Sequence, residues 1–162
     1  MTRKKMLIGS LLLVLASMSI SHGAQAEVKT QSVVEREYEA FLQRPVAKED
    51  IQILKRADEI LSNETIWDRN GTRKCYRLAD SWNLFCALHE ACIEVTGKYD
   101  HRRVAIEEVR FVIEDEAGWF DRPLPFHPLQ EYNNLPTTKF EDIKKVLKTA
   151  MEKETARMNR AE

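Results

Sequence analysis

The clearest helical pattern in the chain is SWNLFCALHEACIEVT, residues 81–96, which a glycine follows. Asp80 or Ser81 can cap the start of a helix here, and Gly97 suits the left-handed conformation that commonly ends one. At about 100° per residue, the apolar side chains spread over about 200° of the helix surface. Because so wide an apolar surface needs contacts on several sides, the sequence predicts a central helix that the other elements surround.

Four more segments carry the spacing of one apolar helical face. They are residues 32–42, 47–61 and 104–116, and a last segment that begins at the capping box Thr138-Lys139-Phe140-Glu141. Between the second and third of these, Asn70-Gly71 separates two β-favouring runs, which is typical of a β-hairpin turn. The predicted fold class is mainly α, with about five helices around a central helix and one small β-hairpin.

The first 26 residues have the features of a secretory signal peptide. Thr2-Arg3-Lys4-Lys5 is basic, residues 6–16 are mostly apolar, and Ala24-Gln25-Ala26 is a small-x-small cleavage site. The apolar run is too short to span a bilayer, which takes about 20 residues, and no Cys stands at the cleavage point to accept a lipid. We therefore expect a periplasmic or secreted mature protein with no membrane anchor after cleavage.

Removal of 26 of the 162 residues leaves 136, which suits one domain. The expected organisation is a cleaved signal peptide at residues 1–26, an N-terminal helix within residues 27–45, a compact helical domain with the hairpin over residues 46–154 and a charged tail over residues 155–162. The signal carries three of the 25 basic residues and none of the 26 acidic ones, so the mature net charge is -4. This mild acidity argues against a nucleic-acid partner, because such binding needs clustered Lys and Arg.

Three cysteines in an oxidising compartment predict one disulfide and one free thiol. Cys86 and Cys92 lie six residues apart on the predicted central helix, about 9 Å along its axis. This separation exceeds what disulfide geometry accepts. The bridge must therefore include Cys75, paired with either Cys86 or Cys92.

A small thiol enzyme or hydrolase is the alternative function class. Cys86 and His89 share a helix face, and His127 could join them in thiolate–imidazole chemistry. Catalytic thiols usually lie at a helix N-terminus, whereas Cys86 is more than a turn inside the helix and suits a packed interior. The sequence has no Cys-x-x-Cys or His-Glu-x-x-His pair of the kind that marks a zinc site. We expect no cofactor and no metal, and we favour a protein without catalytic activity.

The stretch best suited to binding is WFDRPLPFHP, residues 119–128, whose three prolines exclude a continuous helix. Rigid aromatic residues on a loop can anchor a partner, although they can equally cover the core of their own domain. The candidate binding residues are Trp67, Trp119, Phe120, Phe126, His127, Tyr132 and Asn133. We predict an exported binding or interaction module that uses this loop and the end of the hairpin to hold a protein partner or small ligand in the cell envelope, such as an inhibitor or an immunity protein.

Several short motifs resemble a family of small bacterial domains of unknown function. They are Leu54-Lys55-Arg56-Ala57, Trp67, WNLFCAL at residues 82–88, LQEYNN at residues 129–134 and Phe140-Glu141-Asp142-Ile143. The resemblance covers residues 50–151. It implies a helix, a Trp-bearing hairpin, a central helix with a Leu-x-x-Ala-Leu core pattern, an aromatic-Asn-Asn/Asp turn and a final helix.

The same resemblance bears on the cysteines and on two asparagines. Cys86 occupies the position of a small Gly in the family, which implies a tightly packed core residue. On that basis we favour a disulfide between Cys75 and Cys92. Asn83 stands where the family tends to have Cys, and Asn134 where it tends to have Asp, so any catalytic role at these positions would be lost here. The family has no established activity.

Overall fold

The computed structural model of the chain describes residues 36–77, 79–119 and 127–161. The proposed signal peptide lies outside the described residues, as do Phe120 and Phe126.

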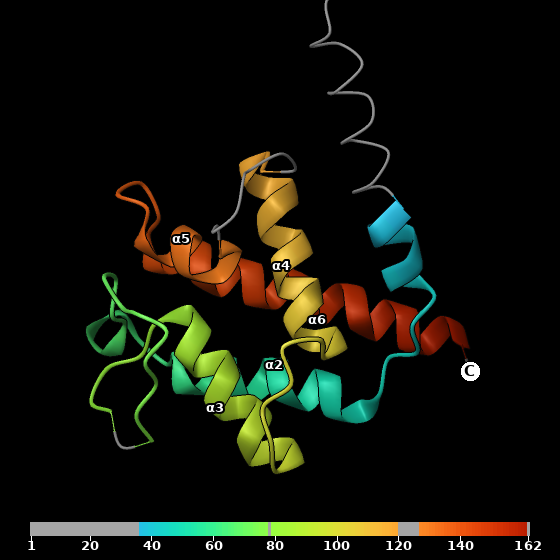
Figure 1. Ribbon diagram of the computed structural model, residues 1–162, viewed down its shortest axis with the longest axis horizontal. Helices are drawn as coiled ribbons and strands as arrows, with labels where there is room; N and C mark the ends of the chain where they lie inside the picture. The colour runs from blue at the N-terminus through green and yellow to red at the C-terminus, as the bar shows by residue number, and fades with distance from the viewer. Residues whose placement is uncertain (1–35, 78, 120–126, 162) are drawn as a thin grey trace, which may run out of the picture.

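The described chain is mainly helical (Figure 1). A helical stretch over residues 36–42 comes first. The elements that follow are α2 (Lys48–Ile60), the 3-10 helix η1 (Glu64–Ile66), α3 (Leu84–Thr96), α4 (Val104–Ala117), α5 (Pro128–Asn134) and α6 (Phe140–Ala161). Helix α6 therefore continues through most of the residues predicted as a charged tail.

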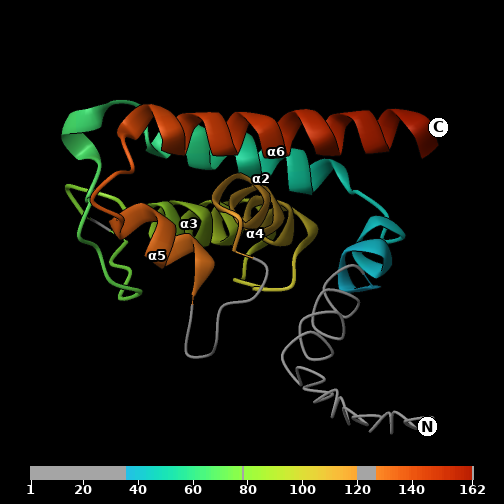
Figure 2. The same cartoon turned by 90° about the horizontal axis from the view of Figure 1, so that it is seen from above.

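The helices form two layers. Figure 2 shows α2 and α6 side by side, with α3, α4 and α5 on one side of this pair. Helix α2 contacts α3, α4 and α6, and α5 contacts α3 and α4. The core lies between the layers and includes Ile53, Leu84, Leu88, Ile113 and Leu147, which are almost completely inaccessible to solvent. Helix α2 thus contacts three of the other helices, whereas α3, which the sequence predicts as the central helix, lies mainly against α2 and α5.

Helix α3 has the broad buried surface that its sequence predicts. Eight of its 13 residues are buried, from Leu84 to Cys92. The helix begins later than expected, because the N-cap is Asn83, whose side chain accepts a hydrogen bond from the Cys86 backbone N–H at 2.9 Å. Gly97 ends it in the left-handed conformation, with a φ of 80°.

The predicted β-hairpin around Asn70-Gly71 is wrong for the described residues between η1 and α3. In this part of the chain a single isolated bridge, between Trp67 and Trp82, is the only strand-like pairing. A Cβ on Gly71 would lie 2.0 Å from Nδ2 of Asn83. The glycine therefore permits a close approach to the start of α3, and the chain is fixed by side chains rather than by strand pairing.

A cluster of buried charged groups joins α2, α4 and α6. Asp50 accepts a hydrogen bond from Nε of Arg103 at 2.7 Å, and Glu108 accepts one from Nη1 of Arg157 at 3.1 Å. Both carboxylate oxygens of Glu154 are buried without a hydrogen-bond partner among the described residues. Burial, with the nearby Asp50 and Glu108, raises the pKa of Glu154 to about 8. Its carboxyl group is therefore mostly protonated at neutral pH.

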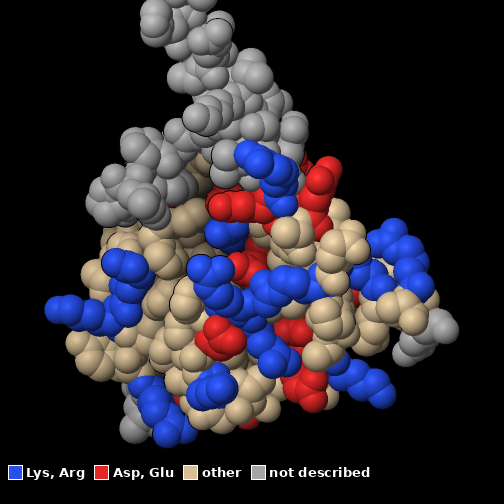
Figure 3. Space-filling view, turned by 45° about the vertical axis from the view of Figure 1, so that its right-hand side comes forward, with Lys and Arg blue, Asp and Glu red and all other residues tan. Residues whose placement is uncertain are grey.

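The same cluster attaches the N-terminal residues to the domain. Nη2 of Arg157 donates to the backbone carbonyl oxygens of Phe41 at 3.2 Å and Arg44 at 2.8 Å. Phe41 also packs with Val104 and Phe111 in a second, smaller hydrophobic cluster. Figure 3 shows Lys and Arg interleaved with Asp and Glu on the face that includes this end of the molecule.

Candidate functional site

Asn133 is completely buried and fixes the chain that follows η1. Its Oδ1 accepts hydrogen bonds from Nε1 of Trp67 at 2.8 Å and from the Leu84 backbone N–H at 3.0 Å. Its Nδ2 donates to the carbonyl oxygens of Asp68 at 2.9 Å and Arg69 at 3.2 Å. Because both ends of the amide are used inside the protein, Asn133 supports the site rather than contacting a ligand.

Two more asparagines hold the next residues of this segment. Nδ2 of Asn83 donates to the carbonyl oxygen of Thr72 at 2.8 Å, and Nδ2 of Asn134 donates to that of Gly71 at 3.1 Å. An amide can donate to a backbone carbonyl, which an ionised carboxylate cannot do. The two asparagines therefore have a structural use in this chain.

A disulfide between Cys75 and Cys86 completes the attachment, with a Cα–Cα distance of 5.2 Å. The predicted pairing of Cys75 with Cys92 is wrong. The contact of Asn83 with Thr72 brings the segment to the first turn of α3, where Cys86 lies. Cys92 is farther along the helix, where it is a fully buried free thiol with Sγ 3.4 Å from the carbonyl oxygen of Lys98.

We call residues 68–77 and 79–83 the clamped segment. It lies between η1 and α3 and carries four basic residues and two acidic ones, in a chain whose formal net charge is -1. The four basic residues, Arg69, Arg73, Lys74 and Arg77, are all exposed. Tyr76 lies among them and exposes 69% of its surface, the largest fraction of any exposed large hydrophobic residue in the described chain. The clamped segment thus combines a fixed backbone with a basic, aromatic surface.

A shallow cavity of about 240 Å³ opens within the clamped segment. Lys74, Tyr76, Trp82 and Asn83 are among the residues that line it. Such a cavity can receive a side chain of a partner.

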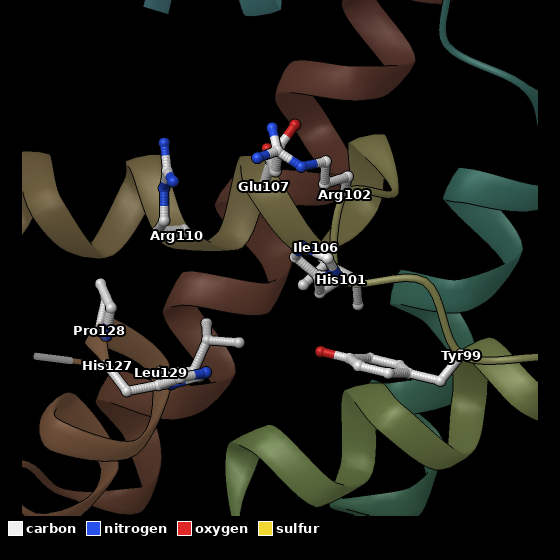
Figure 4. A pocket seen from close by; sticks show the side chains of 9 residues that line it. All are labelled: Tyr99, His101, Arg102, Ile106, Glu107, Arg110, His127, Pro128 and Leu129. Atoms are coloured by element: carbon white, nitrogen blue, oxygen red, sulfur yellow. The ribbon is translucent and has the colours of Figure 1, made fainter. Parts of the chain in front are cut away.

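A second cavity, of about 230 Å³, lies between the turn before α4, α4 itself and the start of α5 (Figure 4). It is lined by Tyr99, His101, Arg102, Ile106, Glu107, Arg110, His127, Pro128 and Leu129. His127 packs edge-on against Phe85 with the ring centroids 5.1 Å apart. Burial lowers the pKa of His127, and the positive charge of Arg73 lowers it further. The imidazole is therefore mainly neutral at neutral pH.

The other described aromatic residues of the predicted binding set, Trp67, Trp119 and Tyr132, lie wholly or partly in the packed interior. Trp119 and Tyr132 are both buried and meet edge-on, with ring centroids 6.1 Å apart. Trp67 is half-buried and packs against Phe140 as well as bonding to Asn133. The structure thus brings Trp67 and Asn133 together and Trp119 and Tyr132 together, whereas His127 lines the second cavity.

The thiol-enzyme alternative depends on a reactive Cys86. In the structure Cys86 is bonded to Cys75, so the thiol that would act as nucleophile is absent. His89 packs its ring against Tyr99, with centroids 4.5 Å apart. The remaining thiol, on Cys92, is fully buried and so closed to a substrate.

Sequence reasoning expected binding at the hairpin end but missed the basic character of the clamped segment, and it missed the second cavity. For the clamped segment a signal existed, since Arg69, Arg73, Lys74, Tyr76 and Arg77 lie within nine residues, but the segment was interpreted as a hairpin strand. For the cavity no local signal existed. Its walls come from residues near 100, 106 and 128 that only the fold brings together.

Among the described residues no three His, Cys, Asp or Glu side chains are arranged to hold a metal ion. None of the helices in this same part of the chain is long and apolar enough to cross a bilayer. No protein-family model, no curated protein and no solved structure matches this chain.

Proposed function

We propose that this protein is an exported binding module that recognises an acidic protein partner in the cell envelope through the clamped segment. One observation carries the proposal. Two buried asparagine side chains, the half-buried side chain of Asn134 and a disulfide fix a segment that has no regular secondary structure, while the outward side chains of that segment are basic and aromatic.

A fixed backbone favours binding because little conformational entropy remains to be lost when the partner arrives. Connecting segments of this length without secondary structure are uncommon in compact domains and are often functional. Tyr and Arg, moreover, are the residue types that most often contribute large shares of binding free energy at protein interfaces. Tyr76 and Arg73 are therefore the side chains that we expect to contribute most.

The charge of the segment indicates the partner. Basic residues on a rim attract an acidic surface and speed association, and this attraction weakens as salt screens it. A role as an inhibitor or immunity protein suits a small exported domain that binds an acidic partner. No observation favours an enzyme, since Cys86 is held in a disulfide.

Site-specific photo-crosslinking in the exporting cell tests this proposal. A crosslinker at position 76 should give a discrete adduct with an acidic protein, and high salt should reduce its yield. The matched control position is Lys148 on α6, whose side chain is 72% exposed. The double variant Arg73→Glu/Lys74→Glu should abolish the adduct at position 76, whereas Lys148→Glu should leave it unchanged. Equal adducts from both positions, or an adduct that survives Arg73→Glu/Lys74→Glu, would contradict the proposal.

A further inference from the structure

We infer that the second cavity, between Tyr99 and His127, is a separate binding site for a small organic anion, with a carboxylate or phosphate group on a compact apolar body. This inference is independent of the proposed function, because the clamped segment contributes no residue to the lining of this cavity.

The lining supplies hydrogen-bond donors in excess of acceptors. Arg102 and Arg110 carry guanidinium groups, and His101 and His127 carry imidazoles. Figure 4 shows the Tyr99 hydroxyl pointing across the cavity towards Leu129. Burial raises the pKa of Tyr99 to about 12, so this hydroxyl stays protonated and can donate a hydrogen bond to an anionic oxygen.

The lining also contains one carboxylate, that of Glu107, and the positive charge of Arg44 balances it. Nη1 of Arg44 forms an ion pair with Glu107, and Nη2 of the same guanidinium donates to the carbonyl oxygen of Arg102. Arg110 pairs through Nε with Glu114 at 3.5 Å. These contacts fix Glu107, Arg110 and the backbone of Arg102 before any ligand binds.

His127 can supply a further hydrogen-bond donor to the cavity. Burial is the largest cause that lowers the pKa of His127, so the ring is mainly neutral and one of its two nitrogens carries a proton. Nδ1 of His127 is buried without a hydrogen-bond partner among the described residues. This nitrogen is therefore available to a ligand in the cavity.

The lining also contains apolar side chains. Ile106 lies on α4, Pro128 and Leu129 lie at the start of α5, and Ile106 and Leu129 are buried. A bare inorganic ion would leave these side chains uncovered, whereas a small ring or short aliphatic chain would bury them. An anionic group on a compact apolar body thus matches the mixed lining of the cavity.

NMR titration of the full mature protein tests the inference. The probes are benzoate, phenyl phosphate, inorganic phosphate and the neutral benzamide. We expect saturable shifts at the amides of Tyr99, Ile106 and Leu129 with benzoate or phenyl phosphate. The probe with the higher affinity shows whether the site prefers a carboxylate or a phosphate group. Inorganic phosphate and benzamide should each bind at least about tenfold more weakly. No saturable shift with either aromatic anion, or equal binding of benzamide, would overturn the inference.

Variants locate the site. Arg102→Gln/Arg110→Gln should weaken binding by about tenfold or more, and Tyr99→Phe, which removes one hydroxyl only, should weaken it by several-fold. Arg160→Gln, an exposed arginine near the end of α6, is the matched control and should bind as the wild type does. Unchanged affinity in Tyr99→Phe together with Arg102→Gln/Arg110→Gln would overturn the assignment to this cavity. Tyr99→Phe keeps the test valid if the double variant fails to fold.

Discussion

Asn133 is the residue on which the position of the clamped segment most depends. Replacing it with Asp keeps the shape and the acceptor but removes the donors to the carbonyl oxygens of Asp68 and Arg69. A buried polar group left unpaired costs about 1–3 kcal/mol, and a carboxyl group at this completely buried position would lie against two carbonyl oxygens, so we expect Asn133→Asp to lower the free energy of unfolding by about 2–4 kcal/mol in urea denaturation. Asn70→Asp, at an exposed position, is the control and should change it by less than about 0.5 kcal/mol. Similar losses in both variants would contradict this role for Asn133.

Glu154 makes stability depend on pH. Its pKa is about 8 in the folded protein against an ordinary value of 4.5, so between these values the folded state holds a proton that the unfolded chain has released. The protonated carboxyl group of Glu154 contributes fully to the free energy of unfolding below pH 4.5, and this contribution is lost as the pH rises through 8. Between about pH 5 and 8, the free energy of unfolding of Glu154→Gln should rise relative to that of the wild type by up to about 1.4 kcal/mol per pH unit, because glutamine does not ionise. Urea denaturation across this range measures it, and a constant difference would show that Glu154 is ionised in the folded state.

At the scale of the elements, the disulfide joins the clamped segment to α3, and its removal should be felt mainly there. Cys75→Ala should lower the free energy of unfolding by about 2–3 kcal/mol, because an 11-residue separation closes a short loop. It should also make the melting temperature insensitive to reductant. Cys92→Ala should leave that sensitivity intact, although it creates a small cavity. If Cys92→Ala removed the response to reductant and Cys75→Ala did not, the pairing would be wrong.

Thiol labelling gives a direct count at the same scale. In the folded, non-reduced protein we expect no reaction, since Cys92 is buried and the other two cysteines are bonded. In denaturant without reductant, one label should appear, and peptide mass spectrometry should place it on Cys92. A label on Cys86 in the folded protein would restore the thiol-enzyme alternative.

The helices were predicted well because their pattern is local. Residues 47–61 and 104–116 agree closely with α2 and α4, since an apolar face repeats along each segment. Helix α5 was missed because the prolines before it indicate a loop, yet Pro128 occupies the first turn of the helix, where proline is tolerated. The hairpin prediction failed for the opposite reason, since Asn70-Gly71 has a strong local signal that contacts from Asn83 and Asn133 override.

At the scale of the whole molecule, the residues predicted to bind do not form one site, because most of the described ones are buried in the interior and His127 lines a cavity. Residues that a sequence marks as aromatic or amide-bearing, such as Trp119 and Asn133, were as consistent with the core as with a surface, and the structure buries both. The surface that we propose for a partner is the outer side of the clamped segment. The conformation of this segment depends on long-range contacts between α5, α3 and residues 68–75. The periodicity of apolar residues along the chain does not predict such contacts.

The central claim is that the clamped segment is rigid before any partner binds, and backbone ¹⁵N relaxation of the free protein measures this directly. We predict order parameters of about 0.85 for residues 68–75, equal to those of α2 and α3, and a fall in Asn133→Asp. Order parameters below about 0.6 across these residues in the oxidised wild-type protein would contradict the claim.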